Sequence, residues 1–385
     1  MITHAPQRSP LWRVHHLLSS VLHFFRSNTV LTIALAAAGL SMCLVPPDAA
    51  YAEYFDYKTL TCLFVTLAVI CALRNIRFFT IIAQKIVRMA GNLRMTVLSL
   101  VYITFIGSML IANDMALLTF LPLGYFALSS TGKDKYMAPT FILQNIAANL
   151  GGMLTPFGNP QNLYLYEKFS IPNGEFMAIM FVPFAVAVAL ITVCCLFFPK
   201  EQLSMRERSY AKLPLKRTIL YLVLFASTIL IVFRVIPYLY GLLIIPAVLL
   251  FVDRDALRQV DYPLLLTFAA FFVFAGNMSR VDAVNNLFSS LLQKNTLLTS
   301  VASCQVISNV PSAILLSQFT ENYRALLMGV NIGGAGTLIA SLASLITFNE
   351  YNRHYQHMTI KYVGLFSAFN FGFLFVLTVL CSFLV

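Results

Sequence analysis

A run of uncharged amide, hydroxyl and glycine residues interrupts an apolar part of the chain at residues 145–166, NIAANLGGMLTPFGNPQNLYLY. Helix-breaking residues are dense in it: Gly151, Gly152, Pro156, Gly158 and Pro160. Proline removes a backbone donor and clashes with the preceding turn, so one continuous helix cannot cover the run. Irregular backbone at membrane depth is tolerated only where protein or a water-filled cavity satisfies it. The run therefore predicts half of a solute-binding site.

The same spacing of residues returns in the second half of the chain. Asn149-Leu-Gly-Gly-x-x-Thr155 matches Asn331-Ile-Gly-Gly-x-x-Thr337, which lies 182 positions later (331 − 149). The polar residues that follow keep the same offset: Asn159 and Asn162 in the first half, Ser341 and Ser344 in the second. Interrupted segments at corresponding positions of two halves are typical of the midplane site of secondary transporters.

A short polar pair precedes each run. Asn113-Asp114 lies upstream of the first, and Ser308-Asn309 takes the corresponding place in the second half, with Pro122 and Pro311 in the arms that follow. The pair Asn113-Asp114 is either the tip of a re-entrant helical hairpin or an exposed loop between two full spans. The recurrence favours two hairpins, whose tips would meet the two broken helices.

Asp114 is the one acid that the hairpin interpretation places deep in an apolar region. A charge at that depth costs roughly 2.5–3.5 kcal/mol on insertion scales, so it needs a reason. It would hold a coupling ion, either Na⁺ or a proton, together with Asn113, Gly158 and Asn309. The alternative is a helix cap that accepts hydrogen bonds from the amides of Met115–Leu117.

The neighbouring polar residues are expected to line the solute site: Asn113, Asn149, Thr155, Asn159, Asn162, Ser308, Asn309, Asn331, Thr337, Ser341 and Ser344. Half-helices beginning near Asp114, Asn159, Val310 and Ser341 would turn free amides and positive dipole ends toward an anion. The alternative for each Asn and Ser is an interhelical hydrogen bond. Backbone hinges and points of close approach are expected at Gly151, Gly152, Pro156, Gly333 and Gly334.

Composition places these residues in a membrane protein. The chain has 385 residues, 59% of them hydrophobic and only 11% charged, whereas a soluble domain has about 25% charged residues. We expect an all-α polytopic fold with about nine or ten spanning helices and two re-entrant hairpins. The net charge of +11 indicates basic cytoplasmic loops rather than a nucleic-acid partner.

The distribution of charge predicts the order of the domains. Residues 1–28 form a basic amphipathic cytoplasmic N-terminus, 29–199 a first repeat, 200–217 a basic cytoplasmic linker, and 218–385 a second repeat with a terminal helix. The positive-inside rule places Asp56, before one span, outside, and Asp261, before its counterpart, inside. The two repeats are therefore expected to have inverted topology.

The sequence lacks the motifs of several classes of activity. The sequence has no HExxH, no GxGD pair and no phosphate-binding G-x-x-x-x-G-K-[ST] loop, so neither an enzyme nor an ATP-driven pump is indicated. The seven cysteines have no CxxC spacing, and no transition-metal site or other cofactor is expected. A passive ion channel remains an alternative.

Three motifs carry a resemblance to a known family: T-P-F-G-N-P-Q-N-L within Asn149–Leu163, N-D-x-A-L-L-x-x-x-P at Asn113–Pro122, and S-N-V-P at Ser308–Pro311. Over residues 29–385 the chain resembles the ion transporter superfamily, in its citrate-transporter-like and arsenite-permease-like branch, especially bacterial inner-membrane anion permeases. The resemblance implies a scaffold domain and a transport domain, a homodimer, elevator-like movement and coupling to Na⁺ or H⁺. The dicarboxylate branch carries Ser-Asn-Thr at both tips, and this chain departs from that pattern.

The residues and the resemblance together predict a secondary active transporter in the cell membrane. Its solute would be a small anion, either citrate- or dicarboxylate-like or an inorganic oxyanion. An arsenite-type efflux permease and a cation/proton antiporter are alternatives within the same class.

Overall fold

The computed structural model describes residues 24–25, 28–203 and 213–385, and over these ranges the regular structure is helical apart from one isolated bridge between Asn92 and Gln202. Most of the expected N-terminal segment and the centre of the expected linker lie outside the described residues. Six helices in the described ranges are long and apolar enough to cross a membrane, and two shorter apolar helices accompany them. The expected all-α polytopic membrane fold is confirmed.

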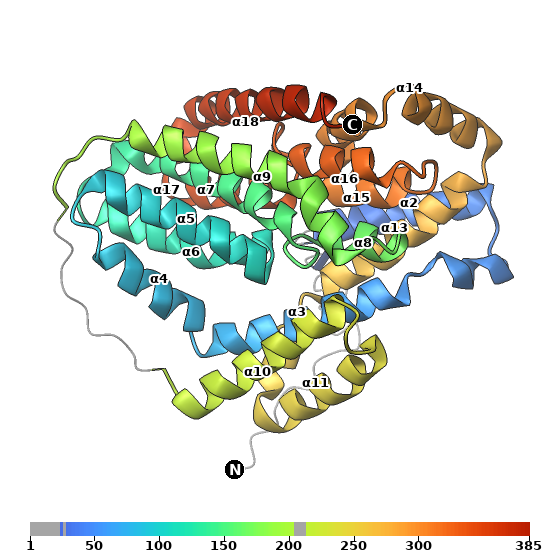
Figure 1. Ribbon diagram of the computed structural model, residues 1–385, viewed down its shortest axis with the longest axis horizontal. Helices are drawn as coiled ribbons and strands as arrows, with labels where there is room; N and C mark the ends of the chain where they lie inside the picture. Colours follow the sequence, from blue (N-terminus) through green and yellow to red (C-terminus); the bar gives the residue numbers. More distant parts are fainter. Residues whose placement is uncertain (1–23, 26–27, 204–212) are drawn as a thin grey trace, which may run out of the picture.

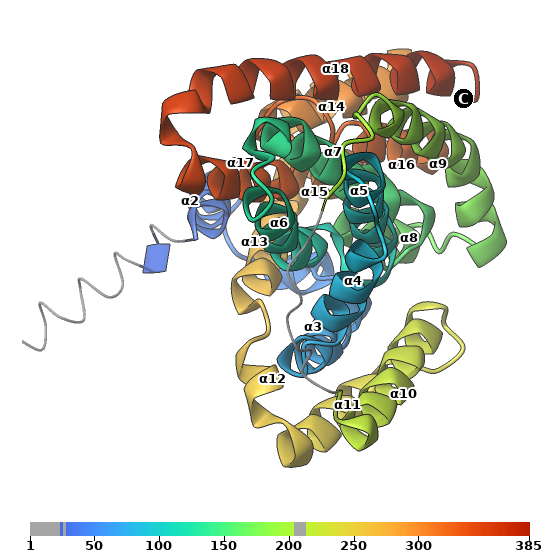
Figure 2. The ribbon, with the colours of Figure 1, turned by 90° about the vertical axis from the view of Figure 1, so that its left-hand side faces the viewer.

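One group of helices packs around α3 and is called the α3 bundle here. Helix α2 packs along α13, while α10, α11 and α12 pack against α3. In Figures 1 and 2, α10 and α11 lie on the far side of α3 from α7 and α18. The members are α2 (Thr29–Leu44), α3 (Tyr57–Asn75), α10 (Leu215–Val232), α11 (Tyr238–Val252), α12 (Arg254–Arg258) and α13 (Tyr262–Ser279). A 3₁₀ helix, η1 (Ala49–Tyr54), joins α2 to α3.

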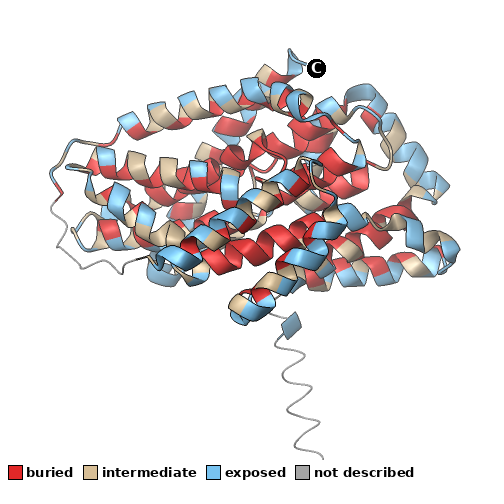
Figure 3. Cartoon of the chain, turned by 60° about the horizontal axis from the view of Figure 1, so that its bottom comes forward, coloured by how far each residue is buried: buried red, intermediate tan, exposed pale blue. Residues whose placement is uncertain are grey.

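A second group of helices packs around α7 and α16 and is called the α7 bundle. From the first half come α5 (Leu93–Ile111), α6 (Asn113–Ser129), α7 (Met137–Gly151), α8 (Pro160–Lys168) and α9 (Asn173–Leu196). From the second half come α14 (Asp282–Ile307), α15 (Asn309–Leu316), α16 (Tyr323–Ile332), α17 (Leu342–His354) and α18 (Thr359–Ser382). The short 3₁₀ helices are η2 (Asp134–Tyr136), η3 (Gly152–Leu154) and η4 (Gln356–Met358). Figure 3 shows buried residues concentrated on the interior helices, while the outer helices carry exposed faces.

The order of elements in the first half recurs in the second. A span (α3 or α13) leads to an amphipathic helix, then a helical hairpin, a broken helix and a long terminal helix. The amphipathic helix is α4 (Phe78–Arg88) in the first half. In the second half it is the start of α14, which kinks at Asn295 (φ −162°, ψ 99°) before becoming a hairpin arm.

Side-chain caps fix where several of these helices begin. Asp56 accepts a hydrogen bond from the amide of Thr59 at the start of α3, and Asp261 accepts one from Leu264 at the start of α13. Ser341 accepts one from the amide of Ser344 at the start of α17. Each cap satisfies an amide that has no partner within its helix. These polar residues thus determine where the helices that carry the site begin.

An ion pair joins the two bundles at the end of α8. Arg234, in the loop between α10 and α11, donates from Nε to Glu167 Oε2 over 3.3 Å. Its Nη1 and Nη2 donate to the carbonyls of Ile171 (3.2 Å) and Tyr166 (2.6 Å). The Glu167 side chain is 4% exposed, so this guanidinium satisfies both a buried carboxylate and the carbonyl end of α8.

Candidate functional site

Both hairpins turn at a non-glycine residue with the same unusual backbone. Ala112 has φ 67° and ψ 152°, and Ser308 has φ 75° and ψ 160°. This region is costly for residues that carry a Cβ, and it persists only where surrounding structure enforces it. Equal backbone strain makes Ala112 and Ser308 equivalent positions.

This equivalence corrects the expected alignment of the two tips. Asn113 matches Asn309, and Asp114 matches Val310, one position away from the pairing of Asn113-Asp114 with Ser308-Asn309. Each Asn Oδ1 accepts a hydrogen bond from the following amide over 2.9 Å, at Asp114 and at Val310. Pro122 and Pro311 do not correspond, because they lie at different distances beyond the tips.

Two threonines tie the broken segments to the hairpin arms in the same way. Thr155 Oγ1 donates to the carbonyl of Met109, and Thr337 Oγ1 to the carbonyl of Gln305, both over 3.1 Å. Each carbonyl lies three residues before its tip. The two threonines therefore hold equivalent tertiary contacts and do not line either cavity described below.

The paired glycines bring the broken helices against the hairpin arms. A Cβ on Gly151 would lie 2.5 Å from the Phe105 carbonyl, and one on Gly333 would lie 2.9 Å from Cys304 Cβ. A Cβ on Gly152 would overlap Asn159 Oδ1. None of the four expected glycines has a positive φ, and a Cβ on Gly334 would have its nearest neighbour, Asn309 Nδ2, at 3.1 Å.

Buried amides cross-link the two broken helices. Asn331 Nδ2 donates to the Leu327 carbonyl (2.8 Å) and to Asn162 Oδ1 (2.6 Å). Because a carbonyl can only accept, this bond fixes the orientation of the Asn331 amide. Its Oδ1 then accepts from Asn159 Nδ2 and Gln161 Nε2, each over 3.4 Å. The acceptor oxygens of Asn159 and Gln161 are buried and have no hydrogen-bond partner among the described residues.

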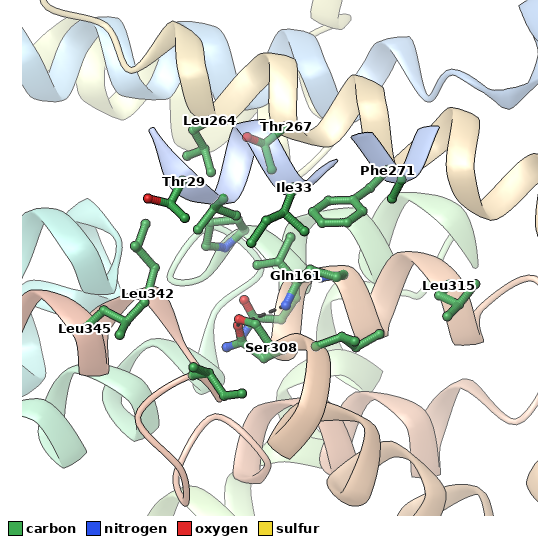
Figure 4. A pocket seen from close by; sticks show the side chains of 18 of the residues that line it. Thr29, Ile33, Gln161, Leu264, Thr267, Phe271, Ser308, Leu315, Leu342 and Leu345 are labelled. Carbon is green, nitrogen blue, oxygen red and sulfur yellow. Dashed lines mark hydrogen bonds between the residues drawn. The ribbon is translucent and has the colours of Figure 1, made fainter. Parts of the chain in front are cut away.

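A cavity of about 440 Å³ lies between the hairpin tips and the α3 bundle. Figure 4 shows Ile33 of α2 and Phe271 of α13 on one side, with Gln161 and Ser308 on the other. Of the expected site residues, the cavity brings together Asn113, Asp114, Ser308 and Asn309. A smaller cavity, of about 30 Å³, adds Asn159 and Asp261 and also reaches Asp114.

Several expected site residues line neither cavity. Asn162 Nδ2 donates to the carbonyls of Gly152, Met153 and Thr155, and Asn149 Nδ2 to the carbonyl of Asn145. Ser341 and Ser344 hydrogen-bond each other over 2.9 Å. The Asn149 bond lies within α7 and the Ser341–Ser344 bond caps α17, while Asn162 bonds the unwound segment before α8. The expected solute-site residues outside both linings are Asn149, Thr155, Asn162, Asn331, Thr337, Ser341 and Ser344, and the expected coupling-ion residue Gly158 also lies outside both.

Asp114 lies at the first hairpin tip, on the wall of both cavities. Its Oδ1 is buried and has no hydrogen-bond partner in the part of the chain that the structure describes. The capping alternative is wrong, because the cap position of α6 is Ala112 and has no side-chain bond. The exposed-loop alternative is also wrong, because the tip packs against the first broken helix, where Asn113 Nδ2 meets Asn149 Oδ1 over 3.4 Å.

The expected free amides are missing at the second tip. The amide of Asn309 donates to the Ala340 carbonyl (3.0 Å), and that of Val310 to Asn309 Oδ1. Pro311 has no amide hydrogen, and the amide of Ser312 donates to the Ser308 carbonyl over 3.1 Å. The positive end of the α15 dipole could still attract an anion, but the first turn has no N–H group left to donate to it.

Two residues that line the cavities, Gln161 and Asp261, were not expected in the site. Gln161 lines the larger cavity and stands inside the first motif, but its counterpart 182 positions later is Ala343. Matching polar residues between the two halves therefore does not identify Gln161. Asp261 was used only to orient the span that follows it, although its place at the start of α13 was a usable signal.

Comparison with known proteins places the chain in a family. A sequence model described as Citrate transporter matches residues 20–323, more than half of the chain. The chain belongs to the citrate transporter family. It is 34% identical over 300 residues to "Uncharacterized transporter MJ0456" of Methanocaldococcus jannaschii, covering 77% of this chain and 82% of that protein. It is 28% identical over 333 residues to "Inner membrane protein YbiR" of Escherichia coli, covering 83% and 87%.

Membership of the citrate transporter family agrees with the apolar helices. The chain is a multi-pass membrane transporter, and its family and relatives are transporters rather than enzymes. The resemblance seen in the three sequence motifs is thereby confirmed.

Proposed function

We propose that this member of the citrate transporter family is a secondary active transporter that couples movement of a small anion to a cation held at Asp114. The unpartnered carboxylate of Asp114 carries the proposal. An isolated carboxylate inside a membrane costs several kcal/mol unless it is neutralised, so a cation or a proton must meet it during the cycle.

The surroundings of Asp114 support the coupling role. Asp261 is the other acid at the small cavity, and none of the described residues lining either cavity is Lys, Arg or His. An anion entering the larger cavity would meet an excess of negative charge. Binding of Na⁺ or H⁺ at Asp114, which shares the larger cavity with Asn113 and Asn309, would remove that repulsion and link the two fluxes.

The two bundles supply the moving parts. We propose that the halves are inverted repeats, that the hairpins are re-entrant, and that the α7 bundle travels as a unit past the α3 bundle in an elevator-type movement. The facing surfaces are apolar, with Leu63 and Leu67 of α3 opposite Phe157 and Leu163. Helix α4 and the start of α14 connect the bundles and would tilt. A homodimer, a bacterial inner-membrane location and a cytoplasmic N-terminus remain predictions.

The proposal is tested with the full chain in proteoliposomes. Uptake of a labelled anion should rise when an inward Na⁺ or proton gradient is imposed, and it should fall to the passive level when an ionophore collapses that gradient. Flux that ignores both gradients and approaches channel rates would support a passive channel instead. Uptake driven by an outward gradient of the coupling cation would identify exchange, as in an antiporter or an efflux permease.

A further inference from the structure

We propose that Arg74 displaces the coupling cation from Asp114 when the first hairpin tip moves along α3. The inference rests on the proposed function and deepens it, because it names the step in which the cation is discharged. Two charged groups of opposite sign carry it, one on each bundle. Neither the Asp114 carboxylate nor the Arg74 guanidinium forms an ion pair in the part of the chain that the structure describes.

Arg74 continues the face of α3 that borders the smaller cavity. Leu63, Leu67 and Ile70 line this cavity from α3, and Asp114 lines it from the first hairpin tip. Their spacing of three or four residues keeps one helix face and leads on to Arg74, four residues beyond Ile70. Four residues advance a helix by about 6 Å, so Arg74 lies one turn past the lining. The positive-inside rule predicts that this end of α3 is cytoplasmic.

The hydrogen-bond partners of the Arg74 guanidinium are neutral. Its Nη1 donates to Met115 Sδ over 3.5 Å, and its Nη2 donates to Gln259 Oε1 over 3.1 Å. Two acids at the same end of the α3 bundle are engaged elsewhere, because Asp253 caps α12 and Asp261 caps α13. The positive charge of Arg74 is therefore available to a carboxylate that approaches it.

Met115 already brings Arg74 to the edge of the first hairpin tip. It follows Asp114 directly in the sequence and lines the smaller cavity with it. A thioether is a weak acceptor, so its contact with the guanidinium is easily given up. Movement of the α7 bundle by about one helical turn along α3 would bring the carboxylate to the guanidinium in its place. A pair of this kind is charge-assisted and can be bidentate.

The exchange of partners conserves charge. Asp114 that holds Na⁺ or a proton releases this cation to water and takes the guanidinium instead, so the carboxylate is neutralised before and after the step. Arg74 belongs to the α3 bundle and carries no charge across the membrane. Coupled transport would then need two events, binding of the cation at Asp114 and its discharge by Arg74.

The test separates discharge of the cation from its binding, with labelled citrate as the probe and the full chain in proteoliposomes. Net uptake driven by an inward gradient of Na⁺ or protons is compared with exchange at equal internal and external concentrations of citrate and cation. Arg74→Gln should lower net uptake at least about tenfold and leave exchange within about twofold, because exchange proceeds with the cation bound. Internal cation should inhibit the variant at an about tenfold lower concentration than the wild type, since nothing then competes for Asp114.

Three further variants show whether the charge of Arg74 is responsible. Arg74→Lys keeps the charge without the planar fork and should restore most of the net uptake. Arg77→Gln removes a positive charge three residues away, on an exposed side chain outside both linings, and should behave as the wild type. In an Asp114→Asn background, Arg74→Gln should have no further effect, because the two residues act as one unit.

The outcomes separate the inference from the proposed function. Net uptake and internal inhibition at the wild-type level in Arg74→Gln overturn the inference and leave cation coupling at Asp114 standing. A loss that Arg74→Lys does not restore also overturns it, since the charge would then not be the cause. A tenfold rise in the KM for citrate during exchange would instead make Arg74 a solute-binding residue and would likewise overturn it. Wild-type uptake that ignores both gradients contradicts the proposed function, and the inference falls with it.

Discussion

The two hairpin tips share one backbone conformation but differ in the charge of their side chains. Ala112 and Ser308 share a positive φ, and the asparagine after each caps the next amide in the same way. The next position differs, because the first tip has Asp114 where the second has Val310. The geometry of the site is therefore symmetric while its charge is not. We infer that the symmetric backbone serves the elevator-type movement and that the single carboxylate serves the coupling to a cation.

The largest expected effect comes from making the tips chemically alike. Val310→Asp adds a second buried carboxylate without a basic partner, and should destabilise the protein by roughly 2.5–3.5 kcal/mol. Val310→Thr is the control, since it keeps the shape and adds no charge. Thermal denaturation in detergent provides the measurement. A Val310→Asp protein as stable as the wild type would show that the second tip tolerates charge as the first does.

Next comes the contrast between two equivalent glycines. A Cβ at Gly152 would overlap Asn159 Oδ1 and lie 2.7 Å from the Gly158 carbonyl, whereas a Cβ at Gly334 finds its nearest neighbour at 3.1 Å. Gly152→Ala should therefore cost roughly 1–3 kcal/mol, and Gly334→Ala clearly less. Gly174→Ala, at a site with open space, controls for the substitution itself. Equal losses of stability at 152 and 334 would contradict the tighter packing of the first break.

The threonine ties should behave alike, because here the two halves match. Thr155→Val and Thr337→Val each remove one hydrogen bond to a hairpin arm and should each cost about 1 kcal/mol. Thr→Ser at either position keeps the hydroxyl and should retain most of the stability. A loss confined to one half, measured by chemical denaturation, would break the equivalence.

The smallest effect concerns the carboxylates that anchor the two broken helices. Glu175 accepts from Tyr323 and Arg324 at the start of α16, and Glu201 accepts from Lys133 and Tyr136 at the start of α7. The hydrogen bond from Lys133 holds the pKa of Glu201 below its ordinary value.

Because the folded pKa of Glu201 is depressed, its contribution is present above the unfolded value of about 4.3 and is lost as pH falls through the folded value. Glu201→Gln should lower the Tm slightly at pH 7, and the gap to the wild type should close as the pH drops below about 4. A gap that stays constant with pH would show that charge at this anchor contributes nothing.

The breaks in the helices were predictable because their causes are local. Glycine and proline predicted a break in the helix within residues 145–166, and the structure ends α7 at Gly151 and begins α8 at Pro160. The starts of α6, α15 and α17 likewise fall within one residue of the sequence expectation, since polar residues mark them.

The rest depends on contacts between distant segments. A positive φ is not expected at an alanine or a serine, so Ala112 and Ser308 could not be recognised as the turning residues. The predicted alignment of the two tips was therefore wrong by one position. The Asn309 amide donates a hydrogen bond to the carbonyl of Ala340, and no local sequence pattern predicts this contact. Gln161 was missed because its counterpart is alanine, although it lines the cavity.

The proposed coupling of the two fluxes depends on the carboxylate of Asp114, and Asp114→Asn removes its charge. Asparagine keeps the shape of the side chain and cannot take up a charge-compensating proton or balance Na⁺. The measurement compares two modes of labelled-anion flux in proteoliposomes: accumulation against a concentration gradient, driven by the coupling cation, and exchange between equal internal and external concentrations. The variant should lose accumulation and keep exchange. Accumulation at the wild-type level by Asp114→Asn would contradict the proposed coupling.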